Sequence, residues 1–196
     1  MKSKEDLILI GGGGHCKSCI DVIELEDKYR IAGIVDLPEK LGQFLMGYSY
    51  LAVDDDLLIL SKQYNYFLIT LGQISNAEAR MFRFNYLVKL GVTFPTIISP
   101  LAYVSKHAKI GQGTIIMHRA LVNAGSITGD NCIINTNAHI EHDVVIGDHC
   151  HIATGAIING GVQVGDGSFI GSGAVTKQYC TIPEGSFIKA GSLFKG

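Results

Sequence analysis

The strongest constraint on the fold is a six-residue repeat that runs without a phase shift from residue 102 to residue 192. The first position of each hexad holds a small residue or Val. An aliphatic residue follows two places later in 13 of 15 hexads, with Thr128 and Thr176 as the exceptions. A hexapeptide period is typical of a parallel β-helix, in which three flat sides make a coil of about 18 residues. The repeat therefore predicts a β-helix over residues 99–196.

The first half of the chain shows a different pattern. Strands are expected at residues 5–10, 29–35, 66–71 and 92–98, and helices at 16–27 and 77–90, from their apolar runs and helical spacing. Alternating strands and helices are typical of a small parallel, Rossmann-like α/β sheet. Pro95 and Pro100 bracket the junction with the first hexad, so we expect an α/β domain over residues 1–98.

Composition excludes several classes of function. The formal net charge is −2 and no run of Lys or Arg occurs, so a nucleic-acid partner is not expected. The apolar run before Gly11 is too short for a signal peptide or a membrane span. Three of the five cysteines occupy small hexad positions, as buried residues of a reduced, cytoplasmic protein would. Cys16 and Cys19 form a C-x-x-C without a second ligand pair, so no metal is expected.

A glycine-rich turn follows the first expected strand, at Gly11–Gly14. Glycines in a strand-to-helix turn let a backbone approach a phosphate, and the helix N-terminus favours an anion. Asp36 ends the next strand 22 residues beyond Gly14, near the spacing of an acid that binds a ribose hydroxyl. The alternative is a tight turn without a ligand. The small sheet favours one nucleotide over a dinucleotide.

His142 stands out among six histidines in the second half of the chain. One coil of 18 residues places Ala124 on one side of it and Gly160 on the other, so its neighbours have almost no side chain. Asp143 follows it, and a carboxylate beside an imidazole raises the basicity of the ring and fixes its tautomer. His142 is therefore a candidate general base; the alternative is a solvated surface histidine. Asn135 and Asn137 suit corners of the backbone better than a ligand role.

Residues 135–148, followed by His151 and residues 159–162, resemble the PglD/NeuD-like family of left-handed β-helix sugar acetyltransferases. The turn from Gly11 to His15 matches the same family in order and spacing, so the resemblance extends over nearly the whole chain. It implies a nucleotide-sugar-binding domain over residues 1–98. It also implies that the β-helix is left-handed and carries the acetyl-CoA site and the catalytic residues.

The resemblance also implies roles for individual residues. His142 would be the base and Asp143 the acid that raises its basicity. The expected nucleotide-sugar contacts are Gly13, Gly14, His15, Asp36 and Gly72, and the expected acetyl-CoA contacts are His151, Gly160, Ser172 and Ala190. His151 would lie at the thioester, and the Gly160 N–H would face its carbonyl. Acetyl-CoA would be the co-substrate, without a metal, and would bind between subunits of a homotrimer.

The chain departs from the family in two places, and three functions are compatible with its sequence. Relatives often have two acids where this chain has Asp36-Leu37, and the G-x-P-A-K/R tail of many relatives is not found after Ala190. The leading hypothesis is N-acetylation of a nucleotide-linked deoxy-aminosugar in bacterial surface glycan synthesis. The alternatives are O-acetylation of a sialic- or legionaminic-type sugar, and a non-catalytic trimeric scaffold.

Overall fold

The computed structural model describes residues 4–196, which form two compact units. The first contains the chain up to Gly72 together with Ala79–Pro95, and the second contains Gln73–Glu78 and Thr96–Gly196. The second unit thus includes a short segment that lies, in the sequence, between the two parts of the first unit. No helix within residues 4–196 has both the length and the apolar character needed to cross a membrane.

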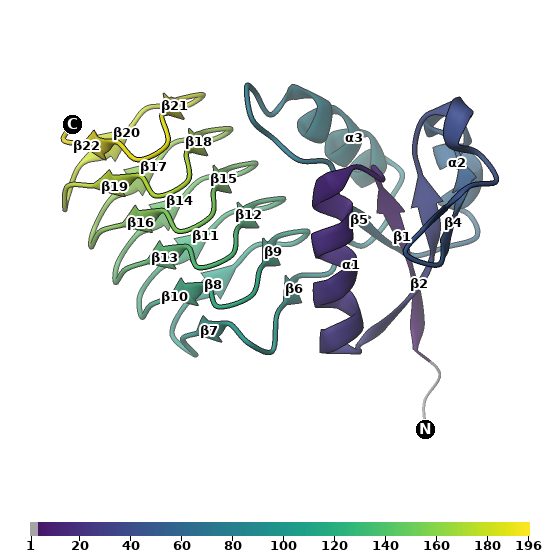
Figure 1. Ribbon diagram of the computed structural model, residues 1–196, viewed down its shortest axis with the longest axis horizontal. Helices are drawn as coiled ribbons and strands as arrows, with labels where there is room; N and C mark the ends of the chain where they lie inside the picture. The colour runs from purple at the N-terminus through teal and green to yellow at the C-terminus, as the bar shows by residue number, and fades with distance from the viewer. Residues whose placement is uncertain (1–3) are drawn as a thin grey trace. The chain divides into compact units, whose positions relative to one another are not determined.

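The first unit is a five-stranded sheet with the strand order β3-β4-β2-β1-β5 and helices on both faces (Figure 1). Its elements are β1 (Glu5–Ile10), α1 (Gly14–Glu26), β2 (Tyr29–Val35), β3 (Phe44–Leu45), β4 (Tyr48–Ala52), α2 (Leu57–Leu60), β5 (Tyr66–Ile69) and α3 (Glu78–Lys89). Strands β4, β2, β1 and β5 are parallel to one another. The predicted small α/β sheet is confirmed, with the carboxyl ends of β1, β2 and β5 on one edge.

The structure differs from the sequence prediction in three respects. Strands β3 and β4 and helix α2 were not predicted. Strand β3 pairs antiparallel with β4, so the sheet is mixed rather than wholly parallel. The strand expected at 92–98 is absent: Thr93 makes one isolated bridge to Tyr66, and Ile97–Ile98 already belongs to the β-helix as β6. Pro95 explains the interruption, because proline has no N–H to donate to a strand ladder.

The sheet buries side chains on both faces because consecutive strand residues point in opposite directions. Ile8 and Ile10 of β1 pack in one cluster with Leu57 and Leu60 of α2 and with Phe84 of α3. Leu7 and Leu9 point to the other face and are fully buried. Strand β1 is therefore buried on both faces over residues 7–10, directly before the glycine turn.

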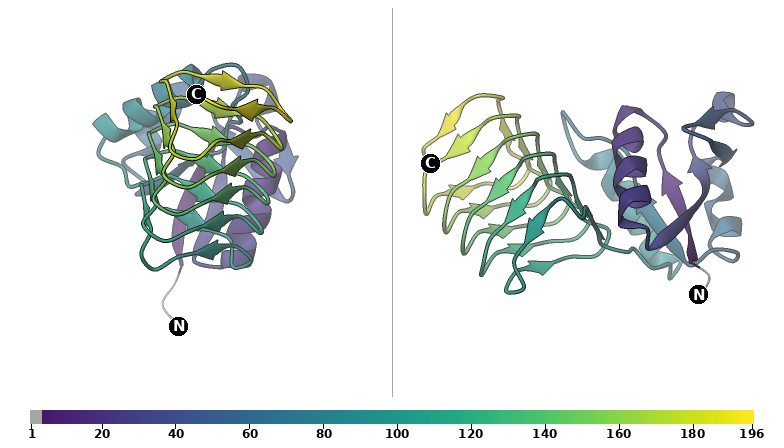
Figure 2. Two further views of the ribbon diagram at one scale, coloured as in Figure 1. Left: turned by 90° about the vertical axis from the view of Figure 1, so that its left-hand side faces the viewer. Right: turned by 60° about the horizontal axis from the view of Figure 1, so that its bottom comes forward.

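The second unit is the predicted left-handed parallel β-helix, with three-sided coils stacked along its length (Figure 2). Each strand is two residues long and begins six residues after the one before, with the strands β6 (Ile97–Ile98), β7 (Tyr103–Val104), β8 (Lys109–Ile110), β9 (Ile115–Ile116), β10 (Leu121–Val122), β11 (Ile127–Thr128), β12 (Ile133–Ile134), β13 (His139–Ile140), β14 (Val145–Ile146), β15 (His151–Ile152), β16 (Ile157–Ile158), β17 (Gln163–Val164), β18 (Phe169–Ile170), β19 (Val175–Thr176), β20 (Thr181–Ile182), β21 (Phe187–Ile188) and β22 (Leu193–Phe194). They form three parallel sheets. Each residue pairs with the one 18 positions later, as His139 does with Ile157.

Both predicted hexad positions point into the β-helix. The aliphatic position is fully buried in the middle coils, as at Ile134, Ile140 and Ile158. The small position is buried there as well, as at Ala138 and Ala156. Residues of both columns form one continuous apolar cluster. Burying one such aliphatic side chain stabilises the fold by about 1.5–3 kcal/mol, so the repeated columns supply most of the driving force.

One column of small residues also holds the coils together by hydrogen bonds. Cys132 and Cys150 donate through Sγ to carbonyl oxygens 15 residues later, at 3.1 and 3.2 Å. Thr114 and Ser168 occupy the same column and donate from their hydroxyls in the same way. Cys132 and Cys150 are therefore buried, as expected, and they also donate hydrogen bonds between coils, a role that the sequence did not reveal. Cys180 was also expected to be buried but is only half-buried.

A ladder of carboxylates ties successive coils at one edge of the β-helix. Asp148 accepts a hydrogen bond from the Asp130 N–H at 2.8 Å, and its own N–H donates to Asp166 at 2.9 Å. A Cβ on Gly129 would lie 2.3 Å from Asp148 Oδ1, so the small residue at this corner leaves room for the carboxylate. Each carboxylate thus satisfies a backbone N–H that would otherwise have no partner in the protein.

Replacing Asp148 tests this ladder. Asp148→Ala removes the acceptor of the Asp130 N–H and is expected to lower the free energy of unfolding by about 1 kcal/mol. Asp148→Asn is the matched control, because its amide oxygen still accepts the bond and one like charge is gone. Thermal unfolding at a fixed protein concentration measures both. An alanine variant as stable as the wild type would contradict the role given to the ladder.

Candidate active site

The glycine turn divides into two packed and two open glycines. A Cβ on Gly11 would lie 2.5 Å from Leu71, and one on Gly12 would lie 2.3 Å from the Tyr50 ring, so both positions require glycine for packing. A Cβ on Gly13 or Gly14 would meet nothing within 4 Å. Gly13 is the N-cap of α1 and has no side-chain cap, and no acidic residue lies in the first helical turn. The open glycines and the helix N-terminus together form a surface suited to an anion.

Asp36 holds the turn from the end of β2. Its carboxylate accepts hydrogen bonds from the Gly12 N–H and from the Leu37 N–H, and it pairs with Lys40 Nζ at 2.9 Å. Burial alone would raise the pKa of Asp36, but these three hydrogen bonds outweigh it and lower the pKa. The side chain is only 11 % exposed. Asp36 thus shapes the turn, and contact with a ribose stays a prediction.

His15 and Gly72 lie side by side at the same edge of the sheet. A Cβ on Gly72, which follows β5, would lie 3.5 Å from the Cβ of His15. His15 Nε2 is 3.3 Å from the Sγ of Cys19, one helical turn later. The structure therefore brings together all five residues that were predicted to contact the nucleotide-sugar, at the carboxyl ends of β1, β2 and β5.

His142 and Asp143 form an exposed pair at the corner that follows β13. His142 Nδ1 lies 2.9 Å from Asp143 Oδ2, and the two side chains are 49 % and 70 % exposed. A carboxylate can only accept, so a neutral His142 carries its proton on Nδ1 and has a free lone pair on Nε2. Asp143 has a φ of +59°, and a Cβ on Gly125 would lie 2.4 Å from its Oδ1. Gly125 therefore leaves room for the Asp143 carboxylate, which lies beside the His142 ring.

Gly160 lies directly against the His142 ring. A Cβ at Gly160 would lie 2.6 Å from His142 Nε2, so this glycine leaves the nitrogen accessible. At two other corners, the side chain of an asparagine, Asn123 or Asn135, accepts a hydrogen bond from the N–H of the next residue. Asn159, which precedes Gly160, instead donates through its side chain to the Thr176 carbonyl. Within residues 4–196 no acceptor pairs with the Gly160 N–H. A free lone pair and a free N–H thus occur at one corner.

His151 is buried and both of its ring nitrogens are engaged. Nδ1 donates to the Gln73 carbonyl at 2.7 Å, and Nε2 accepts from the Asn135 amide at 3.0 Å. The Phe169 ring meets it edge-on at 5.2 Å, and only 7 % of His151 is exposed. Gln73 also donates to the Gly167 carbonyl at 3.0 Å. His151 therefore fastens the Gln73–Glu78 segment to the β-helix and lies away from the His142 corner.

The remaining predicted coenzyme contacts occupy another edge of the β-helix. Ser172 and Ala190 are exposed, lie 18 residues apart and occupy equivalent corners of neighbouring coils, where the Gly191 N–H donates to the Ser172 carbonyl at 2.8 Å. One chain thus brings His142, Asp143 and Gly160 together but places Ser172 and Ala190 at a different edge.

Sequence analysis missed residues that shape both parts of the site. The Tyr50 hydroxyl donates to the Gly12 carbonyl at 2.8 Å, and Lys40 lies 5.5 Å from the Tyr50 ring centre. The spacing of four residues between Asp36 and Lys40 could have indicated this ion pair from the sequence. No sequence pattern pointed to Tyr179. Its ring lies over Gly161, where an added Cβ would be 2.3 Å from Tyr179 Cδ1.

Both thiols of the C-x-x-C pair, Cys16 and Cys19, are buried. Burial raises the pKa of Cys16 to about 11 and also raises the pKa of Cys19, so neither thiol ionises near neutral pH. In the part of the chain that the structure describes, no group of three or more His, Cys, Asp or Glu side chains could hold a metal ion.

Comparison with known proteins agrees with both units. Residues 6–84 match the family described as PglD N-terminal domain, and residues 125–160 match the bacterial transferase hexapeptide family. The acetyltransferase domain of PglB from Neisseria gonorrhoeae, solved with acetyl coenzyme A, is 31% identical. That match covers 96% of this chain and 90% of the other, with a TM-score of 0.87. A search of curated proteins gives no significant match.

Two further structures resemble this one. PerB from Caulobacter crescentus, solved with CoA and GDP-perosamine, is 28% identical over 98% of this chain and 90% of the other, with a TM-score of 0.90. WeeI from Acinetobacter baumannii shares the fold at 20% identity, over 97% of this chain and 96% of the other, with a TM-score of 0.74. The fold and these matches define an acyltransferase of the hexapeptide-repeat class. More narrowly, the chain belongs to the PglD-like hexapeptide acetyltransferases.

Proposed function

We propose that the protein transfers the acetyl group of acetyl-CoA to the amine of a nucleotide-linked deoxy-aminosugar, in bacterial surface glycan synthesis. The observation that carries the proposal is the His142 corner, where a free imidazole nitrogen lies against Gly160. The N. gonorrhoeae relative was solved with acetyl coenzyme A, and PerB with CoA and GDP-perosamine. Use of acetyl-CoA as the donor agrees with a cytoplasmic site of action.

The residues of the corner supply the two groups that acetyl transfer requires. As the amine attacks the thioester carbonyl, His142 Nε2 accepts a proton from the attacking nitrogen. Asp143 stabilises the imidazolium that forms through the hydrogen bond at Nδ1. The Gly160 N–H donates to the oxygen that gains negative charge. When the carbon–sulfur bond breaks, the imidazolium returns the proton to the departing thiolate.

The glycine turn suits the nucleotide part of the acceptor. The open positions Gly13 and Gly14 and the uncapped start of α1 favour its phosphates. Lys40, paired with Asp36, adds a positive charge at the same edge. His15, Asp36 and Gly72 complete the proposed contacts on this side. A titration with UDP-, GDP- and CMP-sugars identifies the nucleotide, and the response is expected to be lost on Gly14→Val.

His142→Ala is expected to lower kcat by roughly 10²–10⁴, the range for loss of a general base. The measurement is thiol release from acetyl-CoA with a panel of nucleotide-linked aminosugars. His107→Ala is the matched control, because His107 is an exposed histidine at the same edge of the β-helix, two coils away. A kcat near that of the wild type for His142→Ala would overturn the assignment of the base. Thiol release with hydroxyl acceptors only would favour O-acetylation, and silence with every acceptor would favour a scaffold.

Gly160→Ala tests the geometry beside the base. The new Cβ would displace the His142 ring, and a shift of about 1 Å in a catalytic group can lower kcat by roughly 10²-fold. The fold is expected to survive, because the clash involves the end of an exposed side chain. If the effect acts through His142, adding Gly160→Ala to His142→Ala lowers kcat no further. Additive losses would contradict this mechanism.

His151 provides a test between two roles. The family resemblance assigns it to the acetyl-CoA thioester, but its burial and its two hydrogen bonds support a positioning role for the segment that follows Gly72. We expect His151→Ala to raise KM for the nucleotide-sugar severalfold while KM for acetyl-CoA stays within about twofold of the wild type. Asn135→Ala, which removes one partner, should act in the same direction but more weakly. A rise in KM for acetyl-CoA alone would favour contact with the thioester.

We also propose that the active unit is a homotrimer with acetyl-CoA bound between subunits. The support is that Ser172 and Ala190 lie at a different edge of the β-helix from His142, so that a second copy could unite them at one site. Sedimentation equilibrium is expected to give three times the mass of the chain. A monomer that is fully active at assay concentration would contradict the shared site.

A further inference from the structure

A cavity lies at the edge of the first unit opposite the glycine turn. It has a volume of about 660 Å³ and is lined by residues at the starts of β1, β2, β4 and β5 and at the end of α1. Because β1 is six residues long, about 20 Å separates this edge from the carboxyl edge that carries the proposed nucleotide contacts. The cavity therefore plays no part in the site already described.

Aromatic rings form much of the wall. Tyr29, Tyr48, Tyr64 and Tyr66 line the cavity, which is half of the eight tyrosines in the chain. All four are half-buried, so each ring is anchored in the protein and still has an accessible part. The Tyr29 and Tyr66 rings lie 5.3 Å apart at 55°. Rigid, partly exposed rings of this kind offer apolar faces with a polar hydroxyl at the tip.

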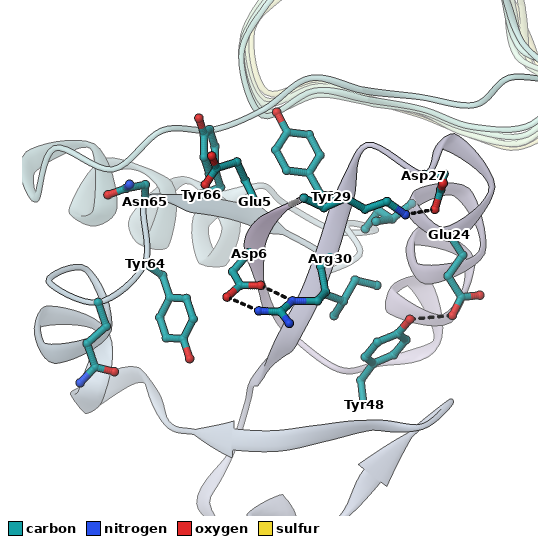
Figure 3. Close-up of a pocket in the computed structure, with 14 residues that line it drawn as sticks. Glu5, Asp6, Glu24, Asp27, Tyr29, Arg30, Tyr48, Tyr64, Asn65 and Tyr66 are labelled. Atoms are coloured by element: carbon teal, nitrogen blue, oxygen red, sulfur yellow. Dashed lines mark hydrogen bonds and ion pairs between the residues drawn. The ribbon is translucent and has the colours of Figure 1, made fainter. Parts of the chain in front are cut away.

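Fixed polar groups lie between the rings. Arg30 donates to both carboxylate oxygens of Asp6, at 2.6 and 2.8 Å, and the Tyr48 hydroxyl donates to Glu24 at 2.8 Å. Figure 3 shows the Asp6–Arg30 pair at the centre of the view, with Tyr64 to one side and Tyr48 to the other. A guanidinium has five N–H groups, so Arg30 keeps donors to spare. The cavity thus presents oriented donors and acceptors.

The charges of the cavity disfavour an anionic ligand. Among the described residues of the lining, two cationic side chains, Lys4 and Arg30, face four carboxylates, which gives a formal charge of −2. The C-terminal end of α1, where the helix dipole is negative, also borders the cavity and has no basic residue in its last turn. Burial and the bond to Glu24 raise the pKa of Tyr48 to about 12, so this hydroxyl remains an uncharged donor. A phosphate or a nucleotide would be repelled here.

We propose that this cavity is a second binding site that takes an uncharged, hydroxyl-rich saccharide. The C–H faces of a sugar ring pack on aromatic rings, and its hydroxyls pair with planar side chains held in fixed orientation, such as the Arg30 guanidinium and the Asp6 carboxylate. Asn65 and Gln63 add amide groups at the rim. The site is independent of acetyl transfer and of the nucleotide-binding edge.

Binding of neutral sugars to the full chain tests the proposal. The probes are maltose, lactose and the N-acetylglucosamine disaccharide, and glucose-1-phosphate is the charged counterpart. Ligand-observed and protein-observed NMR titrations are expected to give a Kd on the order of 1 mM for a neutral probe and no binding of the phosphate. Arg30→Ala and Tyr64→Leu are each expected to weaken binding at least tenfold. Arg30 is 70 % exposed, so its removal leaves the fold intact.

Controls separate this site from the proposed function. Tyr103→Ala removes a tyrosine that is 60 % exposed on the β-helix and is expected to leave sugar binding unchanged. Arg30→Ala is expected to leave nucleotide-sugar binding and acetyl transfer unchanged, whereas Gly14→Val should affect only those. The proposal would be overturned if no neutral probe bound at about 20 mM, which is 20-fold above the expected Kd. It would also be overturned if Arg30→Ala and Tyr64→Leu left the binding intact. Tighter binding of glucose-1-phosphate would overturn it as well.

Discussion

The hydrogen-bonded pairing of each residue with the one 18 positions later determines the rest of the β-helix. It stacks equivalent residues into columns, so that the inward columns must be small or aliphatic along their whole length. A shift of one residue would turn every buried side chain toward solvent. The same pairing places each corner directly above an equivalent corner. The chemistry of His142 therefore depends on what occupies the neighbouring coils.

Glycine serves the two proposed sites in the same way, by leaving space beside a reactive or binding group. At the β-helix corner Gly160 leaves His142 Nε2 accessible, and Gly125 makes room for the carboxylate of Asp143. In the α/β unit Gly11 and Gly12 are needed for packing, while Gly13 and Gly14 face open space. In each place a packed scaffold holds the site rigidly, and the missing side chain provides access for a substrate.

Much of this could be predicted from the sequence because the signals were periodic. The hexads gave the β-helix and its 18-residue coil, and that spacing predicted Gly160 beside His142. Strands β1 and β2 were predicted with the bounds that the structure shows. Short elements such as β3 and α2 were missed, because two to four residues carry no detectable period.

Roles set by contacts between distant residues could not be predicted. Nothing in the sequence pairs His151 with Gln73, 78 residues away, and that hydrogen bond engages one of the two ring nitrogens. Asp36 was predicted to contact a ribose, but nothing in the sequence pairs its carboxylate with the Gly12 N–H, 24 residues earlier. The hydroxyl and thiol column inside the β-helix was also hidden, since small residues signal burial but not hydrogen bonding. In each case the local residue types were compatible with more than one role.

The tautomer of His142 tests the central claim most directly. A base oriented by Asp143 must carry its proton on Nδ1 and leave Nε2 free. Long-range ¹H–¹⁵N correlation spectra of the neutral imidazole, assigned by comparison with His142→Ala, report which nitrogen is protonated. The account predicts the Nδ1–H form for His142 and its loss in Asp143→Ala. A predominant Nε2–H form in the wild-type protein would contradict it.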